Sequence, residues 1–316
     1  MPQAFSREDI KNIIRGLAAT LMLIGVAVVS PLVGVLSTLF VPLPVLYYRA
    51  RLGRNKGLII PLGTLAIMML IFGRVSVDLL LLSELLLGFM LGEFLEANVG
   101  LEKTIVGACV TVLAAGAIGL LILAGMAGTS IYGLVSGYAT NTLELNLVFW
   151  EKMGMSPEFI QMVSDSKERI RDAFISVTPG LLAMAFIFLS WISLLMARSL
   201  FRRAGLFFPD YGPLVRWKAP EILVWGVVIC GAMLLLPASS LKIIGLNGLM
   251  VFLTIFFFEG IAVVAFFFEK KKFPGIVRVF LYSLIVLQQL VLLLVVGLGL
   301  FDVWLNFRKL ETDNSK

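Results

Sequence analysis

Residues 256–272, FFFEGIAVVAFFFEKKK, form an apolar segment that ends in three lysines and holds one carboxylate deep inside. This residue, Glu259, lies in an apolar run that begins near Leu249 and ends at Phe268. An ionised carboxylate in the middle of a bilayer costs about 2.5–3.5 kcal/mol on insertion scales. A membrane helix that contains such a residue therefore needs a partner that compensates the carboxylate, or a function that requires it.

The composition indicates a membrane protein throughout. Hydrophobic residues make up 59% of the 316 residues and charged residues 15%, and the mean hydropathy is +1.00. Soluble domains hold about 25% charged and 45–50% apolar residues, so this chain has more apolar surface than one soluble core can bury. We expect an all-α fold, a polytopic transmembrane helical bundle whose main partner is the lipid bilayer.

Several function classes are excluded by residue type. The chain has no histidine, which removes His-based zinc sites and the Ser–His and Cys–His nucleophiles. Cys109 and Cys230 each lie inside an apolar run, so a disulfide framework is not expected. The basic residues cluster between apolar runs, as in membrane topology rather than a nucleic-acid surface. We expect no enzyme activity, no cofactor, no metal and no nucleic-acid partner.

A membrane span needs about 20 apolar residues, and about eight or nine stretches qualify. The first two share one apolar run that is broken at Ser30–Pro31, which predicts a tight hairpin. The nine candidates are residues 13–30, 32–48, 57–73, 76–97, 102–126, 173–197, 219–236, 247–268 and 279–303.

The distribution of basic residues predicts the orientation. Most of the 26 lysines and arginines fall in segments that are cytoplasmic when the N-terminus is cytoplasmic. We expect a multi-pass protein of the cell inner (plasma) membrane with no cleaved signal peptide. A ninth span places Arg308 and Lys309 outside, against this bias, so the side of the C-terminus stays open.

Residues 129–172 are the one sizeable polar stretch between spans. Ser156 is a typical N-cap residue and Pro157 fits the first helical position, so we expect an amphipathic helix on the outer membrane surface. This helix is either the lid of a pocket or a connector that lies on the surface. Residues 128–142 are rich in glycine and hydroxyl groups, and predict a flexible turn or part of a ligand pocket.

Glu259 has a predicted partner in the next span. Counting from a turn near Phe273–Pro274, the residue at the same depth is Gln289, beside Gln288. A hydrogen bond between the carboxyl group and one of these amides would satisfy both groups. In the structural interpretation, Glu259 is protonated and this hydrogen bond holds the two helices together. In the functional interpretation, Glu259 is a proton or cation site.

The fourth span carries a second pattern. Glu84, Gly88, Gly92 and Glu96 recur every four residues and therefore share one face of a helix. Gly88 and Gly92 form a GxxxG step that allows another helix to approach closely. Glu84 puts a second carboxyl group in the membrane interior, where it and Glu259 could line a polar site.

The C-terminal third contains further candidate positions. Asn247 lies at the expected start of the eighth span and is predicted to cap it. Near the end, Phe301, Trp304 and Phe307 predict an interfacial aromatic belt, with Asp302 and Arg308 at the water boundary.

The C-terminal third resembles a known family. The stretches GLNGLMVFLTIFFFEGIAVVAFFF and GLGLFDVWLNFRKL are similar to the YybS-like family of bacterial membrane proteins. The matching positions are Asn247, Glu259–Gly260, Phe301–Asp302 and Phe307–Arg308. That family is similar in fold to the substrate-binding S-components of energy-coupling factor (ECF) vitamin transporters. The resemblance implies a six-helix S-component-like domain at residues 1–203, followed by three further helices at 204–316.

These observations leave two functions open. The resemblance implies a protein that binds or moves a small solute and that could work with an ECF-type ATPase and its coupling subunit. Gln288, Gln289, Glu84 and Glu259 are then the candidates for the ligand or ion pathway. The alternative is a structural or assembly factor of the membrane, whose buried polar residues hold helices together.

Overall fold

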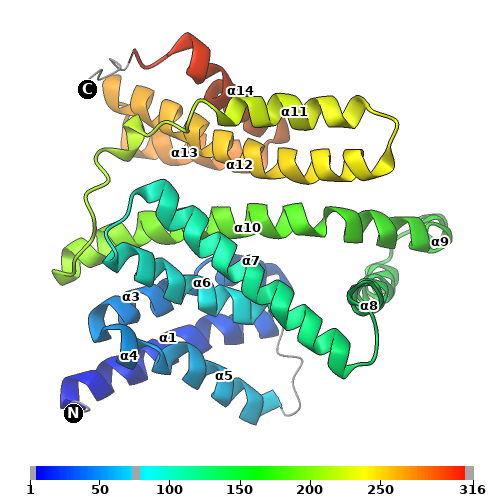
Figure 1. Cartoon of the computed structure of the whole chain (residues 1–316), viewed down its shortest axis with the longest axis horizontal. Coiled ribbons are helices and arrows are strands. Elements are labelled where there is room, and N and C mark those ends of the chain that lie inside the picture. The colour runs from blue at the N-terminus through cyan, green and yellow to red at the C-terminus, as the bar shows by residue number, and fades with distance from the viewer. Residues whose placement is uncertain (1–4, 73–78, 310–316) are drawn as a thin grey trace. The chain divides into compact units, whose positions relative to one another are not determined.

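The computed structural model of the chain describes residues 5–72 and 79–309, and every regular element in these ranges is a helix (Figure 1). The predicted all-α fold is confirmed. The helices form two compact units. The N-terminal unit comprises Met1–Ile175 and Ala185–Asp210, and the C-terminal unit comprises Ser176–Met184 and Tyr211–Lys316. Ser176–Met184, in the middle of a helix, belongs to the second unit, and the predicted division after residue 203 stays a prediction.

The first helix, α1 (Arg7–Val29), begins with a capping box. The backbone N–H of Asp9 donates to Ser6 Oγ at 3.0 Å, and the N–H of Ser6 donates to Asp9 Oδ2 at 3.0 Å. These bonds satisfy two donors that a helix N-terminus otherwise leaves unpaired. Helix α1 therefore starts in the polar segment that precedes the apolar run.

The predicted break at Ser30–Pro31 is confirmed, because α1 ends at Val29 and α2 (Pro31–Thr38) begins at the proline. A second proline begins α3 (Pro42–Leu52). Proline is favoured at the first position of a helix because its missing N–H has no helical partner there. The candidate span 32–48 is thus divided into helices of 8 and 11 residues, each shorter than one crossing.

The core of the N-terminal unit joins α1 to the helices that follow it. Helix α3 packs against α6, which in turn packs against α7. These further helices are α4 (Arg54–Gly57), α5 (Ile59–Phe72), α6 (Leu79–Glu96) and α7 (Leu101–Met126). The buried core cluster consists of Ile24, Val41, Val45, Ile60, Leu85 and Phe89.

The polar stretch between spans is helical. Ser130 caps α8 (Ile131–Lys152) by accepting a hydrogen bond from the N–H of Gly133 at 3.0 Å. The prediction of a flexible turn at residues 128–142 is therefore wrong: the cap starts a helix that its glycines do not interrupt.

The predicted start of the amphipathic helix is confirmed. Ser156 Oγ accepts from the N–H of Phe159 at 3.3 Å, and Pro157 is the first residue of α9 (Pro157–Asp165). Val163 is buried on one face of α9. The long helix α10 (Lys167–Ala204) follows and ends at Gly205, whose φ of 65° allows the chain to leave the helix.

The C-terminal unit is built around its longest helix, α12 (Ser239–Lys270). Figure 1 shows α11 (Leu223–Leu235) and α12 as an antiparallel hairpin. Before α11 lies a short 3-10 helix, Leu214–Arg216. After α12 come α13 (Gly275–Leu287) and α14 (Gln289–Leu305), and α14 packs on α12. The core centres on Ala219, Val224 and Phe256.

Five helical segments in the described residues are long and apolar enough to cross a membrane. A sixth is possible if α13 and α14, bent by 102° at their junction, count together as one broken span. Other candidate stretches differ: α11 is shorter, and α6 carries three glutamates in its 18 residues. The five segments are Arg7–Val29, Arg54–Ile71, Leu101–Met126, Lys167–Ala204 and Ser239–Lys270.

Candidate functional site

Three charged side chains lie together inside the C-terminal unit, and we call them the C-terminal ion cluster: Glu259 on α12, Asp302 on α14, and Arg308 beyond α14. The Arg308 guanidinium donates to Asp302 Oδ2 from Nη2 at 2.8 Å and from Nε at 3.1 Å. Glu259 Oε1 lies 3.5 Å from Arg308 Nη2. All three side chains are 0% exposed.

The cluster also holds the segment that precedes α11. Nη1 of Arg308 donates to the carbonyl oxygens of Val215 at 3.0 Å and Trp217 at 2.8 Å. Glu259 Oε2 accepts a hydrogen bond from the backbone N–H of Ala219 at 3.3 Å. One guanidinium and one carboxylate therefore tie α12, α14 and residues 215–219 to each other.

Two local features bring Arg308 back to Asp302. Asn306 ends α14 with a φ of 42°, a left-handed conformation that asparagine tolerates better than most residues. In this conformation the chain turns out of the helix and its N–H still donates to the Asp302 carbonyl at 3.0 Å. The side chain of Arg308, six residues after Asp302, can then reach the carboxylate.

A close helix crossing places α14 beside Glu259. A Cβ atom on Gly260 would overlap the carbonyl oxygen of Val295, and one on Gly299 would overlap that of Phe256. Glycine at both positions lets the two backbones touch. The motif position Gly260, next to Glu259, therefore has a packing role that any side chain would disturb.

The partner predicted for Glu259 is wrong. Glu259 contacts Arg308 and Ala219, whereas Gln288 and Gln289 are exposed. The prediction assumed one straight helix after the turn, but the chain bends by 102° between α13 and α14, at these two glutamines. Depth counted along a straight helix therefore does not apply beyond residue 288.

Asp302 and Arg308 are not exposed to solvent, and their predicted place at the water boundary of the membrane stays a prediction. Both are buried within the unit, while Phe301 and Trp304 on the same helix are exposed. At a solvated helix end, charged residues face water and aromatic residues face the protein. In this segment the arrangement is reversed. The charged side chains lie inside the protein, and the aromatic rings face outward.

Asn247 has a different role from the predicted cap, because α12 begins at Ser239. Its Nδ2 donates to the carbonyl of Ser176 at 2.8 Å, and its Oδ1 accepts from the N–H of Gly180. Those two backbone groups are four residues apart and would bond to each other in a regular helix. Pro179, beside them, disturbs that helix. Asn247 thus bridges α12 to the turn of α10 that contains Pro179.

The N-terminal unit contains a second cluster that the sequence analysis did not identify, the N-terminal ion cluster of Arg49, Arg54, Glu93 and Glu96. Arg49 is 2% exposed, and its Nη2 lies 2.5 Å from Glu93 Oε1 and 2.5 Å from Glu96 Oε2. Arg54 Nε lies 3.3 Å from Glu93 Oε2. Arg49 and Arg54 follow the second candidate span, and Glu93 and Glu96 lie at the end of the fourth, so the predicted topology was a usable signal for their pairing.

The structure places the remaining predicted residues in the N-terminal unit. Gly88 and Gly92 face α3: a Cβ on Gly88 would overlap the carbonyl oxygen of Pro42, and one on Gly92 would overlap the side chain of Arg49. Glu84 is half-buried on α6. It belongs to the N-terminal unit, whereas Glu259 belongs to the C-terminal unit.

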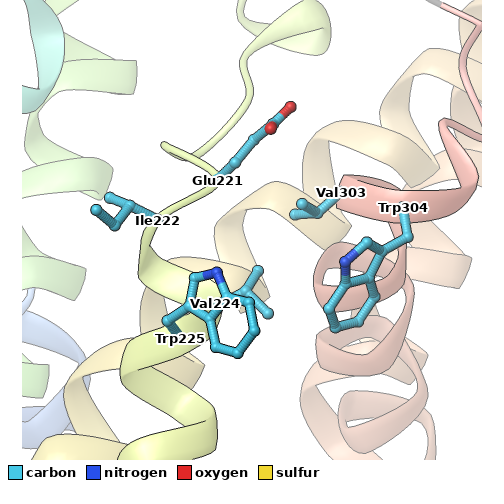
Figure 2. Close-up of a pocket in the computed structure, with 6 residues that line it drawn as sticks. All are labelled: Glu221, Ile222, Val224, Trp225, Val303 and Trp304. Carbon is cyan, nitrogen blue, oxygen red and sulfur yellow. The ribbon is translucent and has the colours of Figure 1, made fainter.

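An open hollow of about 300 Å³ lies between the start of α11 and the end of α14. In Figure 2, Trp225 and Trp304 lie on its two sides, and their side chains are 65% and 61% exposed. Its lining contains no member of the C-terminal ion cluster. Within residues 5–72 and 79–309, no group of three or more carboxylate or cysteine side chains is arranged to hold a metal ion.

The helices and their buried ionic contacts define a polytopic membrane protein. The chain belongs to the family described as predicted membrane protein (DUF2232), whose model matches residues 17–303. No curated protein and no solved structure matches the chain. Within the matched range lie Asn247, Glu259, Gly260 and Asp302. The likeness to the YybS-like family and to the S-components stays a prediction.

Proposed function

We propose that this protein is a non-enzymatic structural or assembly factor of the cell membrane. The observation that carries this proposal is the direction of the Arg308 donors. Nε and Nη2 donate to Asp302, Nη1 donates to two backbone carbonyls, and Nη2 lies 3.5 Å from Glu259 Oε1. The charges of the C-terminal unit therefore contact one another instead of leaving a binding site open.

Burying three charged groups costs free energy of desolvation. This cost argues that the cluster serves to specify which helices pack together. Buried ion pairs add little stability over apolar packing, but removing one partner costs about 3–5 kcal/mol. In a bilayer, helices share the same apolar surroundings whether packed or apart, so polar contacts and close glycine crossings define which helices meet. The cluster and the Gly260–Gly299 crossing together fix one arrangement of α12, α14 and residues 215–219.

The proposed location is the inner (plasma) membrane, with the N-terminus and residues 211–219 on the cytoplasmic side. The contacts of Arg308 with Val215 and Trp217 support a cytoplasmic C-terminus as well. The 102° bend supports the same side, because a re-entrant pair α13–α14 does not cross the bilayer. Arg308 and Lys309 then agree with the distribution of the other basic residues.

The test is a pull-down of the tagged protein in mild detergent, with mass spectrometry of proteins and small molecules. We expect other membrane or cell-envelope proteins to be recovered in constant proportion, without a stoichiometric metabolite. Recovery of an ATPase with a membrane coupling subunit, or of one stoichiometric metabolite, would contradict the proposal.

A second candidate function is the binding or transport of a small solute by an S-component-like core at residues 1–203. Two observations favour it. Broken helices within apolar segments are typical of transporter binding sites, and α13–α14 is broken at Gln288 and Gln289. In addition, Glu259 Oε1 and Asp302 Oδ1 are buried and accept no hydrogen bond from the described residues. A proton or a small cation would satisfy these oxygens.

A further inference from the structure

One face of α10 ends in a basic hollow. Residues 195, 198, 199, 202 and 203 are spaced by three and four positions, so they form one stripe along the helix. They line an open hollow of about 480 Å³. We call it the arginine hollow, and its lining residues are Leu195, Arg198, Ser199, Arg202 and Arg203.

Two of the guanidinium groups in the arginine hollow lack an acidic partner. Arg202 and Arg203 are exposed, and within the described part of the chain no carboxylate lies within 4.0 Å of either group. Arg49 and Arg54 in the same unit are paired with Glu93. The arginine hollow therefore presents an excess of positive charge that the N-terminal ion cluster does not.

The hollow lies at the C-terminal end of a candidate membrane span, where a lipid headgroup is expected. Helix α10 is one of the five candidate spans, and the arginines occupy its last two turns before Gly205. Leu195 and Met196 precede the arginines on the side of the helix middle and are 45% and 38% exposed. An apolar surface thus adjoins the guanidinium groups on the side of the membrane interior.

Basic residues at a helix C-terminus are favourable in any protein, because they complement the helix dipole. That effect needs no hollow, no shared stripe and no adjacent apolar surface. A guanidinium group binds phosphate oxygens with two parallel hydrogen bonds, which suits it to a phosphodiester better than a lysine. Basic clusters at the end of a membrane helix attract anionic lipids.

We propose that the arginine hollow binds the phosphate of an anionic phospholipid, with Arg202 and Arg203 on the phosphate and an acyl chain along Leu195. The charge of the hollow, its position at the end of a span and the apolar surface beside it support this occupant. Inorganic phosphate or an acidic segment of a partner protein would match the charge but would not use Leu195.

The test is native mass spectrometry of the full-length protein in detergent, titrated with phosphatidylglycerol or phosphatidylcholine. We expect wild type to retain phosphatidylglycerol in preference to phosphatidylcholine. The Arg202→Gln/Arg203→Gln variant should bind phosphatidylglycerol about 25-fold more weakly, since each basic residue near an anionic bilayer contributes roughly fivefold. The matched control is Lys271→Gln/Lys272→Gln, which removes the same charge from the exposed end of α12.

Three results would overturn the proposal. The first is an equal loss of binding in the control, which would indicate general attraction by charge. The second is full displacement of the lipid by millimolar inorganic phosphate, which would indicate a free-phosphate site. The third is equal retention of both lipids by wild type. If the glutamine variant does not fold, Arg202→Lys/Arg203→Lys keeps the charge, and binding as tight as in wild type would contradict the role of the guanidinium groups.

Discussion

Replacing Arg308 with methionine should destabilise the protein strongly. The change keeps the length of the apolar part of the side chain and removes the guanidinium that contacts Asp302, Glu259 and the carbonyls of Val215 and Trp217. Two buried carboxylates and two backbone carbonyl oxygens lose their cation. Breaking a buried ion pair by removing one partner costs about 3–5 kcal/mol.

The expected effect can be measured as a shift of the apparent Tm in detergent. Each kcal/mol corresponds to roughly 2–4 °C for chains of 150–250 residues, so Arg308→Met should lower the Tm by about 6–20 °C. The control is Lys309→Met, one residue further along the chain, because Lys309 is exposed. If the two variants melt within about 2 °C of each other, the structural role of the ion cluster is refuted.

Three further predictions concern the C-terminal unit. Gly299→Leu should lower the Tm by separating α14 from Phe256 on α12, whereas Gly297→Leu should not, since a Cβ at Gly297 meets no atom within 4 Å; equal shifts would contradict the close crossing. Asn247→Leu should cost about 1–3 kcal/mol of stability, because α12 loses two hydrogen bonds to the backbone of α10, and an unchanged Tm would count against the bridge. A reporter fused after residue 316 should be active in the cytoplasm, and activity outside would contradict the re-entrant arrangement of α13 and α14.

Local signals in the sequence predicted the helices and several of their ends. Ser156 and Pro157 identify the start of α9, and Pro31 identifies the start of α2, because capping and the missing proline N–H act within one turn. The same kind of reasoning failed at Asn247. The polar residues that begin α12 lie eight positions earlier, at Ser239, so an asparagine inside the helix was taken for its cap.

The need of Glu259 for a partner could be predicted, but the identity of that partner could not. Burial of a carboxylate is a property of one segment, whereas the contact with Arg308 depends on the bend at Gln288 and on the chain reversal at Asn306. Neither feature follows from hydropathy. The N-terminal ion cluster was closer to prediction, because Arg49 follows the second candidate span and Glu93 lies at the end of the fourth, and both ends are cytoplasmic when the N-terminus is cytoplasmic.

The most direct test of the structural account is to purify Glu259→Gln beside wild type and to measure both the Tm and the small molecules that remain bound. Glutamine can still accept the hydrogen bond from Ala219, and Arg308 keeps Asp302 as its close ionic partner. The account predicts a Tm within about 3 °C of wild type and the same bound species. An unchanged Tm with the loss of a stoichiometric solute or cation would contradict it, because the charge of Glu259 would then serve a ligand.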